Sequence, residues 1–511
     1  MKKITYIYSR KFVILILALG LIMTTLISGI AIEQTKKDSL IIGLYLEPPT
    51  LDPQFNTAHI ARQVYCNIYD NLVMKDDSGK YIPGLAESWT ISEDRLEYTF
   101  ILRKGIRFHN GEELKASDVK FTIDRGIGSP HVAFMYANIK GAEVVDDYKV
   151  KIQLETPSQI FLEIMTLPHT GIVNEKAVTE LGEGYVRNPI GTGPYIFENW
   201  IRGERINLVS NEDYFLGSPA IKKLTYRIII DTTIGMVALE KGEVDMYPEL
   251  SPVDKGNIIK NPNLKYDEAI GAHIEQILFN TESEIFSNVL VRRSVSHAVN
   301  REAILQVAKE GVGVLAEHQI PEYFSDYYTD KVKAYPLDIN KAKELLKQAG
   351  YPDGFSFTIS VNPGYPERIA QIIQDNLNEI GIKAEIEVFE WGTYLSMLSA
   401  GNFEMAVLTN SIQLLDPGLL LNWIFHSDNY GPGGNRCRYV NPEADKLIDA
   451  SFLESDVLKR KEIFEEIVTI VHNDAVYIPL YWLINNIGYN KDLKGVKPLA
   501  IAHYKVIEYS W

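Results

Sequence analysis

The chain has 511 residues, of which 46% are apolar and 23% charged, and its formal net charge is −16 at pH 7. This composition is typical of a packed globular protein and excludes a disordered or collagen-like chain. The negative charge argues against binding to a phosphate backbone, which requires clustered Lys and Arg. The two cysteines, Cys66 and Cys437, are too few for a disulfide scaffold or a zinc ribbon, so we expect two isolated thiols.

The N-terminus has the pattern of an export signal. Four basic residues between positions 2 and 11 precede an uncharged, mostly apolar run over residues 12–32. At about 1.5 Å per residue, this run is also long enough to cross a bilayer as an uncleaved anchor. We therefore predict a signal peptide or membrane anchor at 1–32, a linker at 33–39 and a protein that acts outside the cytoplasm. No cysteine lies in or just after the run, which excludes a lipid anchor on cysteine.

Strand and helix patterns alternate along the rest of the chain. Residues 96–102 and 148–155 alternate between apolar and polar, which predicts half-buried strands. Residues 369–380 carry isoleucine and leucine at helical spacing, and this stripe ends at Gly381, where glycine favours a helix C-cap. Residues 382–388 then alternate as a strand again. Helices interleaved with short strands indicate α/β or α+β domains.

Local motifs of catalysis are absent from the sequence. No two of the ten histidines lie within five residues of each other, so there is no local zinc pair. The sequence contains neither a GxSxG nucleophile elbow nor a GxxxxGK[ST] phosphate loop. GVGVLA at 311–316 follows a helix pattern rather than a strand, which argues against dinucleotide binding. We predict that the protein is not an enzyme and holds no cofactor.

Motifs that extend over many residues are more informative about the class of protein than these local motifs. Residues 83–125 read PGLAESWTISEDRLEYTFILRKGIRFHNGEELKASDVKFTIDR. Further motifs are LDP at 51–53, NPIGTGPYIFENW at 188–200, ALEKGEVDMY at 238–247, VRRSVSHAVNREAIL at 291–305, AKELLKQAGYPDGF at 342–355, YVNPEADKLID at 439–449 and HNDAVYIPLYW at 472–482. In this order the motifs resemble the family 5 solute-binding proteins, which are the peptide- and nickel-binding receptors of ABC importers.

The resemblance implies an α/β fold of the periplasmic-binding-protein type (type II, cluster C), with two lobes, a hinge and a ligand cleft between the lobes. Lobe I would comprise 40–275 and 485–511, with a subdomain at about 83–205, and lobe II would comprise 276–484. Lobes of this kind close around their ligand. The implied partners are ABC permease and ATPase subunits and a small-molecule, metal or peptide ligand. We expect a monomer that binds no nucleic acid.

Some of these motifs also make sense as scaffolding. In GTGPY, Gly191 and Gly193 permit positive φ and Pro194 restricts φ, which predicts a tight turn that leads into a strand. Asn110 and Gly111 predict another turn. His109, just before that turn, is therefore expected to be structural rather than a ligand contact.

The residues that bind the peptide α-amino group in this family differ here. Peptide-binding members usually carry an Asp four residues before the proline of a DP pair and a Trp three residues earlier; before Pro417 these positions are Gln413 and Asn410. A neutral amide cannot supply the charge-assisted hydrogen bond of a carboxylate. Residues 360–366 also lack the Arg that dipeptide binders use for the ligand carboxylate. These departures weaken a free-dipeptide hypothesis and leave longer peptides open. The predicted ligand contacts are Asn56, Tyr394, Asn410 and Gln413.

Histidines favour a metal ligand instead. Five histidines fall on segments that contribute to the family's cleft: His59, His131, His169, His426 and His503. Imidazole is a good ligand for nickel, and distant residues can converge in a cleft. The nickel-binding branch carries arginines at the positions of Pro130 and His169. Because these arginines are missing here, an anionic chelator of the metal would lose the side chains that bind it. We predict a receptor that captures nickel, free or chelated, as transported ligand, with oligopeptide or dipeptide import as the alternative.

Overall fold

The structure is a computed structural model that describes residues 37–76, 79–251, 254–411, 416–431, 434–498, 500 and 504–511. Residues 39–510 form one compact unit. Within the described ranges, no helix is long and apolar enough to span a membrane. The predicted export signal or anchor at 1–32 lies outside the described residues.

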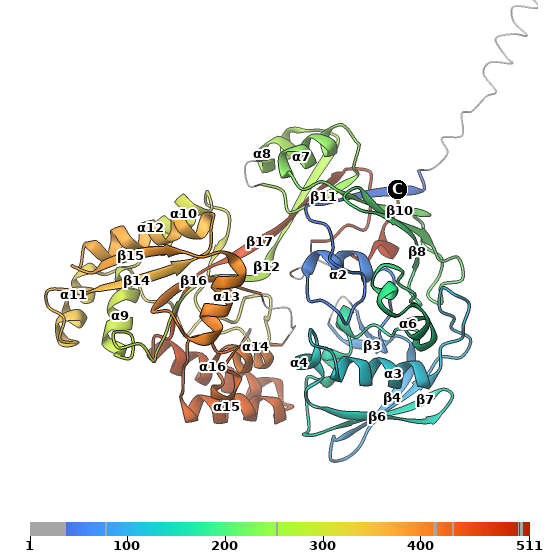
Figure 1. Cartoon of the computed structure of the whole chain (residues 1–511), viewed down its shortest axis with the longest axis horizontal. Helices are drawn as coiled ribbons and strands as arrows, with labels where there is room; N and C mark the ends of the chain where they lie inside the picture. Colours follow the sequence, from blue (N-terminus) through green and yellow to red (C-terminus); the bar gives the residue numbers. More distant parts are fainter. Residues whose placement is uncertain are drawn as a thin grey trace, which may run out of the picture. The chain divides into compact units, whose positions relative to one another are not determined.

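Two long antiparallel strands join the two lobes of this unit. They are β12 (Leu264–Phe279) and β17 (Tyr477–Asn490), and they pair with each other along most of their length (Figure 1). The main sheet has the order β15-β14-β16-β12-β17-β11-β1-β10-β9-β8, so the same pair borders the strands of both lobes. The pairing shifts register between Ile270 and Ile274 and again at Glu275. The predicted lobe boundaries at 275 and 485 fall within these two strands.

Lobe I combines the second half of the main sheet with a smaller antiparallel sheet of order β4-β5-β7-β6. Apolar side chains of that smaller sheet pack against α3 and α5 in one core. The strands of lobe I are β1 (Ser39–Leu44), β2 (Val73–Lys75), β3 (Tyr81–Pro83), β4 (Ala86–Ile91), β5 (Glu97–Leu102), β6 (Ile139–Asp146), β7 (Lys149–Leu154), β8 (Tyr195–Ile201), β9 (Arg205–Ser210), β10 (Lys223–Ile228) and β11 (Met246–Pro248). Its helices are α2 (His59–Tyr65), α3 (Ala116–Ile127), α4 (Ala133–Tyr136), α5 (Phe161–Ile164), η1 (Pro168–Thr170), α6 (Glu175–Leu181), η2 (Gly182–Arg187), α7 (Thr232–Glu240), α8 (Lys255–Lys260) and η5 (Val506–Glu508).

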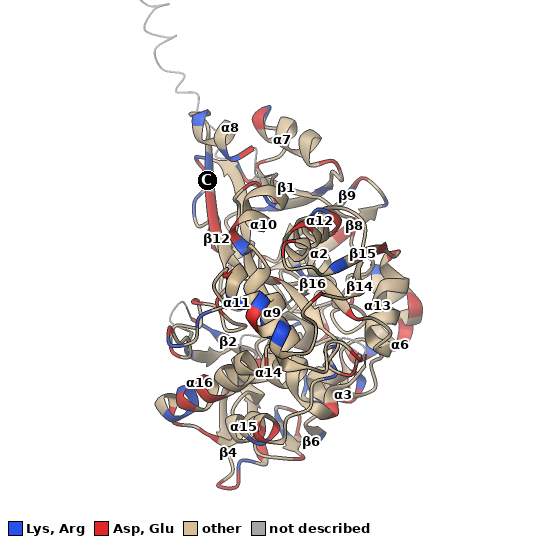
Figure 2. Ribbon diagram, turned by 90° about the vertical axis from the view of Figure 1, so that its left-hand side faces the viewer, with Lys and Arg blue, Asp and Glu red and all other residues tan. Residues whose placement is uncertain are grey.

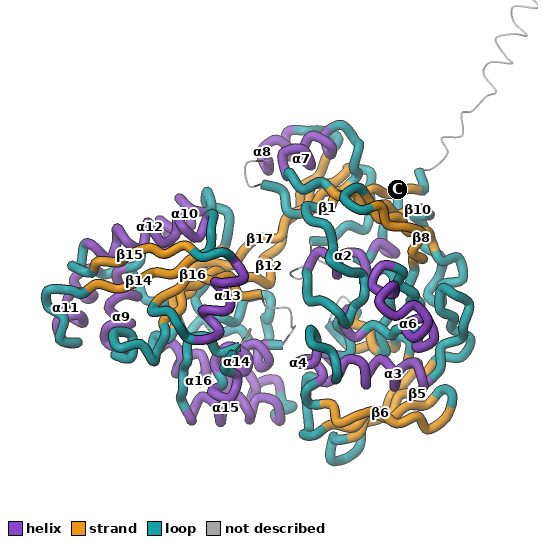
Figure 3. The backbone as a smooth tube through the Cα atoms, viewed as in Figure 1, coloured by secondary structure: helices purple, strands orange, loops and turns teal. Residues whose placement is uncertain are grey.

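Lobe II is a sheet covered by helices on both faces (Figure 3). One core joins α9, α10, α11 and α12 to the sheet, and the other joins α13, α14, α15 and α16 to its opposite face. The strands are β13 (Val314–Leu315), β14 (Ser356–Val361), β15 (Lys383–Val388) and β16 (Met405–Ser411). The helices are α9 (Val289–Ala298), α10 (Arg301–Ala308), α11 (Ile339–Gln348), α12 (Tyr365–Asn378), α13 (Trp391–Ala400), α14 (Pro417–Phe425), η4 (Ser427–Asn429), α15 (Pro442–Leu453) and α16 (Val457–Asn473).

The periodic patterns of the sequence are confirmed. The strand patterns at 96–102 and 148–155 are β5 and β7, and the helical stripe at 369–380 lies in α12 and the turn that follows it. Gly381 has a φ of 85°, as expected of a glycine that ends a helix. In the view of Figure 2, acidic and basic residues are interspersed over the helices of the described chain, as expected of a solvated surface.

The glycines of the GTGPY motif have a different role from the one that the sequence suggested. Gly191 and Gly193 are not among the described residues with positive φ. A Cβ on Gly191 would lie 2.1 Å from the carbonyl oxygen of Ile68, and one on Gly193 would lie 2.5 Å from the Ile68 carbonyl carbon. The Gly193 N–H donates to that same carbonyl oxygen at 2.8 Å. Glycine is thus required here because two backbone segments meet, not because of a left-handed turn.

His109 lies against this motif. Its Nδ1 accepts the N–H of Gly191 at 3.4 Å, and its Nε2 lies 3.0 Å from the carbonyl oxygen of Gly193. Burial lowers the pKa of His109 to about 4, so the ring is neutral at pH 7. Both ring nitrogens are used within the fold, in agreement with the predicted structural role.

Gly193→Ala tests the close backbone approach. We expect the added methyl to push against Ile68 and to lower the free energy of unfolding by about 1–3 kcal/mol, as overpacked substitutions do. Urea unfolding followed by circular dichroism measures this loss. Gly184→Ala is the matched control, because its Cβ would meet no atom within 4 Å. Equal losses in the two variants would contradict the close-approach explanation.

Candidate ligand-binding site

A cavity of about 1230 Å³ opens between structural elements that are far apart in the sequence. Lobe I lines most of it, through the end of α2, β2, the turn at η1 and the C-terminal segment after β17. Tyr323, in the lobe II loop between β13 and α11, completes the lining. Ligand sites for small molecules usually enclose about 300–1000 Å³, so this cavity has room for a ligand of several residues.

An acidic and a basic side chain, Asp70 and Lys505, line this cavity. Asp70 is deeply buried, and its carboxylate accepts hydrogen bonds from Thr192 Oγ1 and Tyr214 Oη, both at 2.8 Å. Burial raises the pKa of Asp70, and these two donors together with nearby Lys505 oppose the rise. Lys505 also lines the cavity, is half-buried and forms no ion pair with another described residue. The cavity therefore offers a fixed carboxylate and a cation that is available to a ligand.

Four of the five predicted metal ligands are described, and each has a separate environment. His59 lies 3.1 Å from an Arg62 nitrogen and 2.9 Å from Glu249 Oε1. His131 contacts the ring of Phe55, with 6.0 Å between the centroids. His169 lines the cavity and contacts the ring of Tyr65, with 6.0 Å between the centroids.

His426 caps the 3-10 helix η4 by accepting the Asp428 N–H at 3.2 Å. His503 lies outside the described residues. No group of three or more His, Cys, Asp or Glu side chains among the described residues is placed to hold a metal ion. Metal binding through these histidines stays a prediction. Cys66 and Cys437 are both free thiols, as expected.

Two of the predicted ligand contacts are used inside the fold. The Asn56 side chain donates to the Asp52 carbonyl at 2.9 Å and accepts the Ala58 N–H at 3.0 Å. Tyr394 is fully buried and donates to the carbonyl oxygen of Val407 at 2.6 Å. Their polar groups therefore already have partners, and ligand contact there stays a prediction.

Asn410 differs from these two residues, because it lines a second, smaller cavity in lobe II. Gln413 lies outside the described residues. Sequence reasoning missed Arg436, which lines that same cavity, as well as Asp70 and Lys505 in the larger one. No local motif marked them, because several of their neighbours come from other segments of the chain.

Comparison with known proteins decides the family. The model of the bacterial extracellular solute-binding proteins, family 5 middle, matches residues 80–432. The chain belongs to this family. Its two-lobed α/β fold is accordingly that of the periplasmic binding proteins, as predicted.

Individual relatives of this solute-binding protein agree with that assignment. Heme-binding protein A of Haemophilus influenzae is 30% identical over 81% of this chain and 81% of the relative. The glutathione-binding protein GsiB of Salmonella paratyphi A is 29% identical over 88% of this chain and 92% of the relative. The solved structure of the ABC transporter-associated periplasmic binding protein DppA from Helicobacter pylori, in complex with peptide STSA, matches with a TM-score of 0.81 and 29% identity. The match covers 93% of this chain and 98% of that one.

The family assignment establishes the general role. This solute-binding protein is the substrate receptor of an ABC importer and acts outside the cytoplasm. It works with permease and ATPase subunits, binds a small-molecule or peptide ligand and is not an enzyme.

Proposed function

We propose that this receptor captures short peptides and delivers them to its permease. The size of the cavity carries the proposal, because about 1230 Å³ accommodates several residues and far exceeds a bare metal ion. Its lining suits a peptide, because Lys505 can donate hydrogen bonds to ligand oxygens and the buried Asp70 carboxyl lies in the same lining. Relatives support the peptide class: one is named for glutathione, itself a tripeptide, and one was solved with a four-residue peptide.

Nickel, our first hypothesis from the sequence, has less support. Its predicted ligands His59, His131 and His426 contact different neighbours. The names of the three relatives refer to haem, glutathione and a peptide. We therefore place nickel as an alternative outcome of the binding experiment.

Calorimetry on the purified protein distinguishes the two ligands. We expect trialanine, tetra-alanine or glutathione to bind with a Kd of about 1 μM or below, which corresponds to about −8 kcal/mol or more of binding free energy. NiCl₂ and the nickel–histidine complex should give no saturable heat. Tight nickel uptake without binding of any peptide would refute the proposal.

Two lysines offer a matched pair for the same measurement. Lys505 and Lys497 both line the cavity, but Lys497 Nζ already lies 4.0 Å from Glu508 Oε2. We expect Lys505→Gln to weaken peptide binding more than Lys497→Gln does, because Lys505, unlike Lys497, forms no ion pair with another described residue. Equal affinities of the two variants would show that Lys505 does not contact the ligand.

A further inference from the structure

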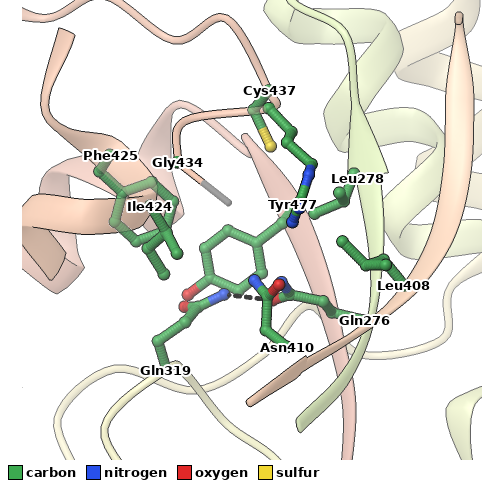
Figure 4. Close-up of a pocket in the computed structure, with 11 residues that line it drawn as sticks. Gln276, Leu278, Gln319, Leu408, Asn410, Ile424, Phe425, Gly434, Cys437 and Tyr477 are labelled. Atoms are coloured by element: carbon green, nitrogen blue, oxygen red, sulfur yellow. Dashed lines mark hydrogen bonds between the residues drawn. The ribbon is translucent and has the colours of Figure 1, made fainter. Parts of the chain in front are cut away.

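A second, small cavity lies in lobe II, and β12, β16 and α14 supply part of its lining. Its volume is about 10 Å³, about the space that one water-sized atom needs. Figure 4 shows how β12, β16, α14 and the loop after β13 contribute to its lining. On the same helix α14, Trp423 stacks on Phe134 of lobe I with 5.5 Å between the ring centroids. The cavity therefore lies beside a point where the two lobes meet.

Arg436 is the unusual member of this lining. It is half-buried, and its Nε is fully buried without a hydrogen-bond partner. No hydrogen bond or ion pair joins its side chain to any residue in the described part of the chain. Burial lowers its pKa, and the groups that oppose this effect are Tyr394 and Cys437, not a carboxylate. A guanidinium withdrawn from water without a counter-charge is unfavourable.

Two other buried arginines of lobe II have hydrogen-bond acceptors of the kind that Arg436 lacks within the described chain. Arg460 forms a bidentate ion pair with Asp416, with nitrogen–oxygen distances of 2.6 and 2.9 Å. Arg292 donates to the carbonyl oxygens of Phe286 and Asp474. Arg436 has no equivalent acceptor among the described residues, so its charge is left for a group that enters from the cavity.

Three neutral amides line the same cavity as this cation. Gln319 Nε2 donates to Gln276 Oε1 at 2.8 Å, which holds both amides in place and leaves the Gln276 amide nitrogen for another acceptor. The buried Oε1 of Gln319 has no donor among the described residues. Asn410, which also lines the cavity, makes no side-chain hydrogen bond within the described structure. Amide nitrogens donate to an anion without cancelling the positive charge of Arg436.

We propose that Arg436, with the side-chain amides of Asn410 and Gln276, forms a subsite for a ligand carboxylate. This inference rests on the proposed peptide function. The guanidinium supplies the charge and a planar pair of donors, which match a carboxylate better than a point charge does. The carboxylate is either the C-terminus of the peptide or an acidic side chain, and Gln319 Oε1 can accept a neighbouring peptide N–H.

Arg436→Gln tests the subsite with matched peptides. We expect the wild-type receptor to bind trialanine about 10- to 100-fold more tightly than trialanine amide, the range of a hydrogen-bonded charge. In R436Q this preference should disappear. Arg438→Gln is the control, because Arg438 lies in the same loop and already donates to the Ser399 carbonyl at 2.7 Å. It should keep the preference, and circular dichroism should show both variants folded.

A second pair of peptides locates the source of the carboxylate. Preference for Ala-Glu-Ala amide over Ala-Gln-Ala amide, lost in R436Q, would assign the subsite to an acidic side chain. If folded R436Q retains the wild-type affinities for all four peptides, the subsite is refuted while peptide binding stands.

A small carboxylate ligand tests the subsite independently of peptide binding. N-acetylglycine should raise the melting temperature of the wild-type protein and of R438Q, but not of R436Q. If this result holds while no peptide binds, the subsite stands and the proposed peptide function fails. If no peptide binds and N-acetylglycine protects R436Q as well as wild type, both proposals fail.

Discussion

Asp416→Ala is expected to lower the free energy of unfolding by about 3–5 kcal/mol, the usual loss when one partner of a buried ion pair is removed. Asp416 and Arg460 are both buried, and the two form two short hydrogen bonds. Asp416 Oδ1 also accepts the N–H groups of Gly418 and Leu419, and so caps the start of α14. The substitution leaves the guanidinium of Arg460 without its counter-charge. Urea unfolding at pH 7 measures the loss.

Two further variants identify the cause of this loss. Asp449→Ala should have almost no effect, because the Asp449 side chain is 70% exposed and lies 3.5 Å from His426. Combining Asp416→Leu with Arg460→Met should destabilise less than Asp416→Ala alone, since no buried charge then remains unpaired. A double variant as unstable as the sum of the single variants would contradict the ion-pair explanation.

The same ion pair bears on ligand binding. Asp416 fixes the first turn of α14, and the last turn of this helix supplies Ile424 and Phe425 to the small cavity. We therefore expect a change at the helix start to reach the proposed carboxylate subsite through this helix, without any contact to the ligand.

Glu275→Gln is expected to flatten the dependence of stability on pH. Burial raises the pKa of Glu275 to about 7 from an ordinary value of 4.5, although Tyr365 and Thr409 donate to it at 2.8 and 2.9 Å. Between these pH values the folded chain holds a proton that the unfolded chain releases. The resulting stability is fully present below pH 4.5 and is lost as the pH rises through 7. The free energy of unfolding that is lost over this pH range amounts to about 3 kcal/mol.

Unfolding by urea at several pH values between 4.5 and 8 tests this expectation. The wild-type protein should lose about 3 kcal/mol more than E275Q over this range. Glu385→Gln is the control, because Glu385 is an exposed carboxylate on β15 of the same sheet. A pH profile of E275Q that parallels the wild type would show that Glu275 titrates at its ordinary pKa.

Local periodicity accounts for the parts of the fold that were predicted. The alternation at 96–102 and the helical stripe at 369–380 depend on which face of one element is buried, so neighbouring residues suffice to reveal them. The ordered motifs from residue 83 onward indicated the family, and the comparison confirmed it. The prediction that Gly193 is needed for a positive φ was wrong. Glycine is needed there because of the Ile68 backbone, which is more than a hundred residues away in the sequence.

The sequence by itself determined the extracytoplasmic, two-lobed receptor class and the absence of local catalytic motifs. Only the tertiary structure decided which side chains share a site. It gave His59, His131 and His426 separate neighbours, and it brought Arg436 beside Gln276, Gln319 and Asn410. The physical reason is that a binding site depends on burial and on unpaired charge, and both arise only when distant segments pack together.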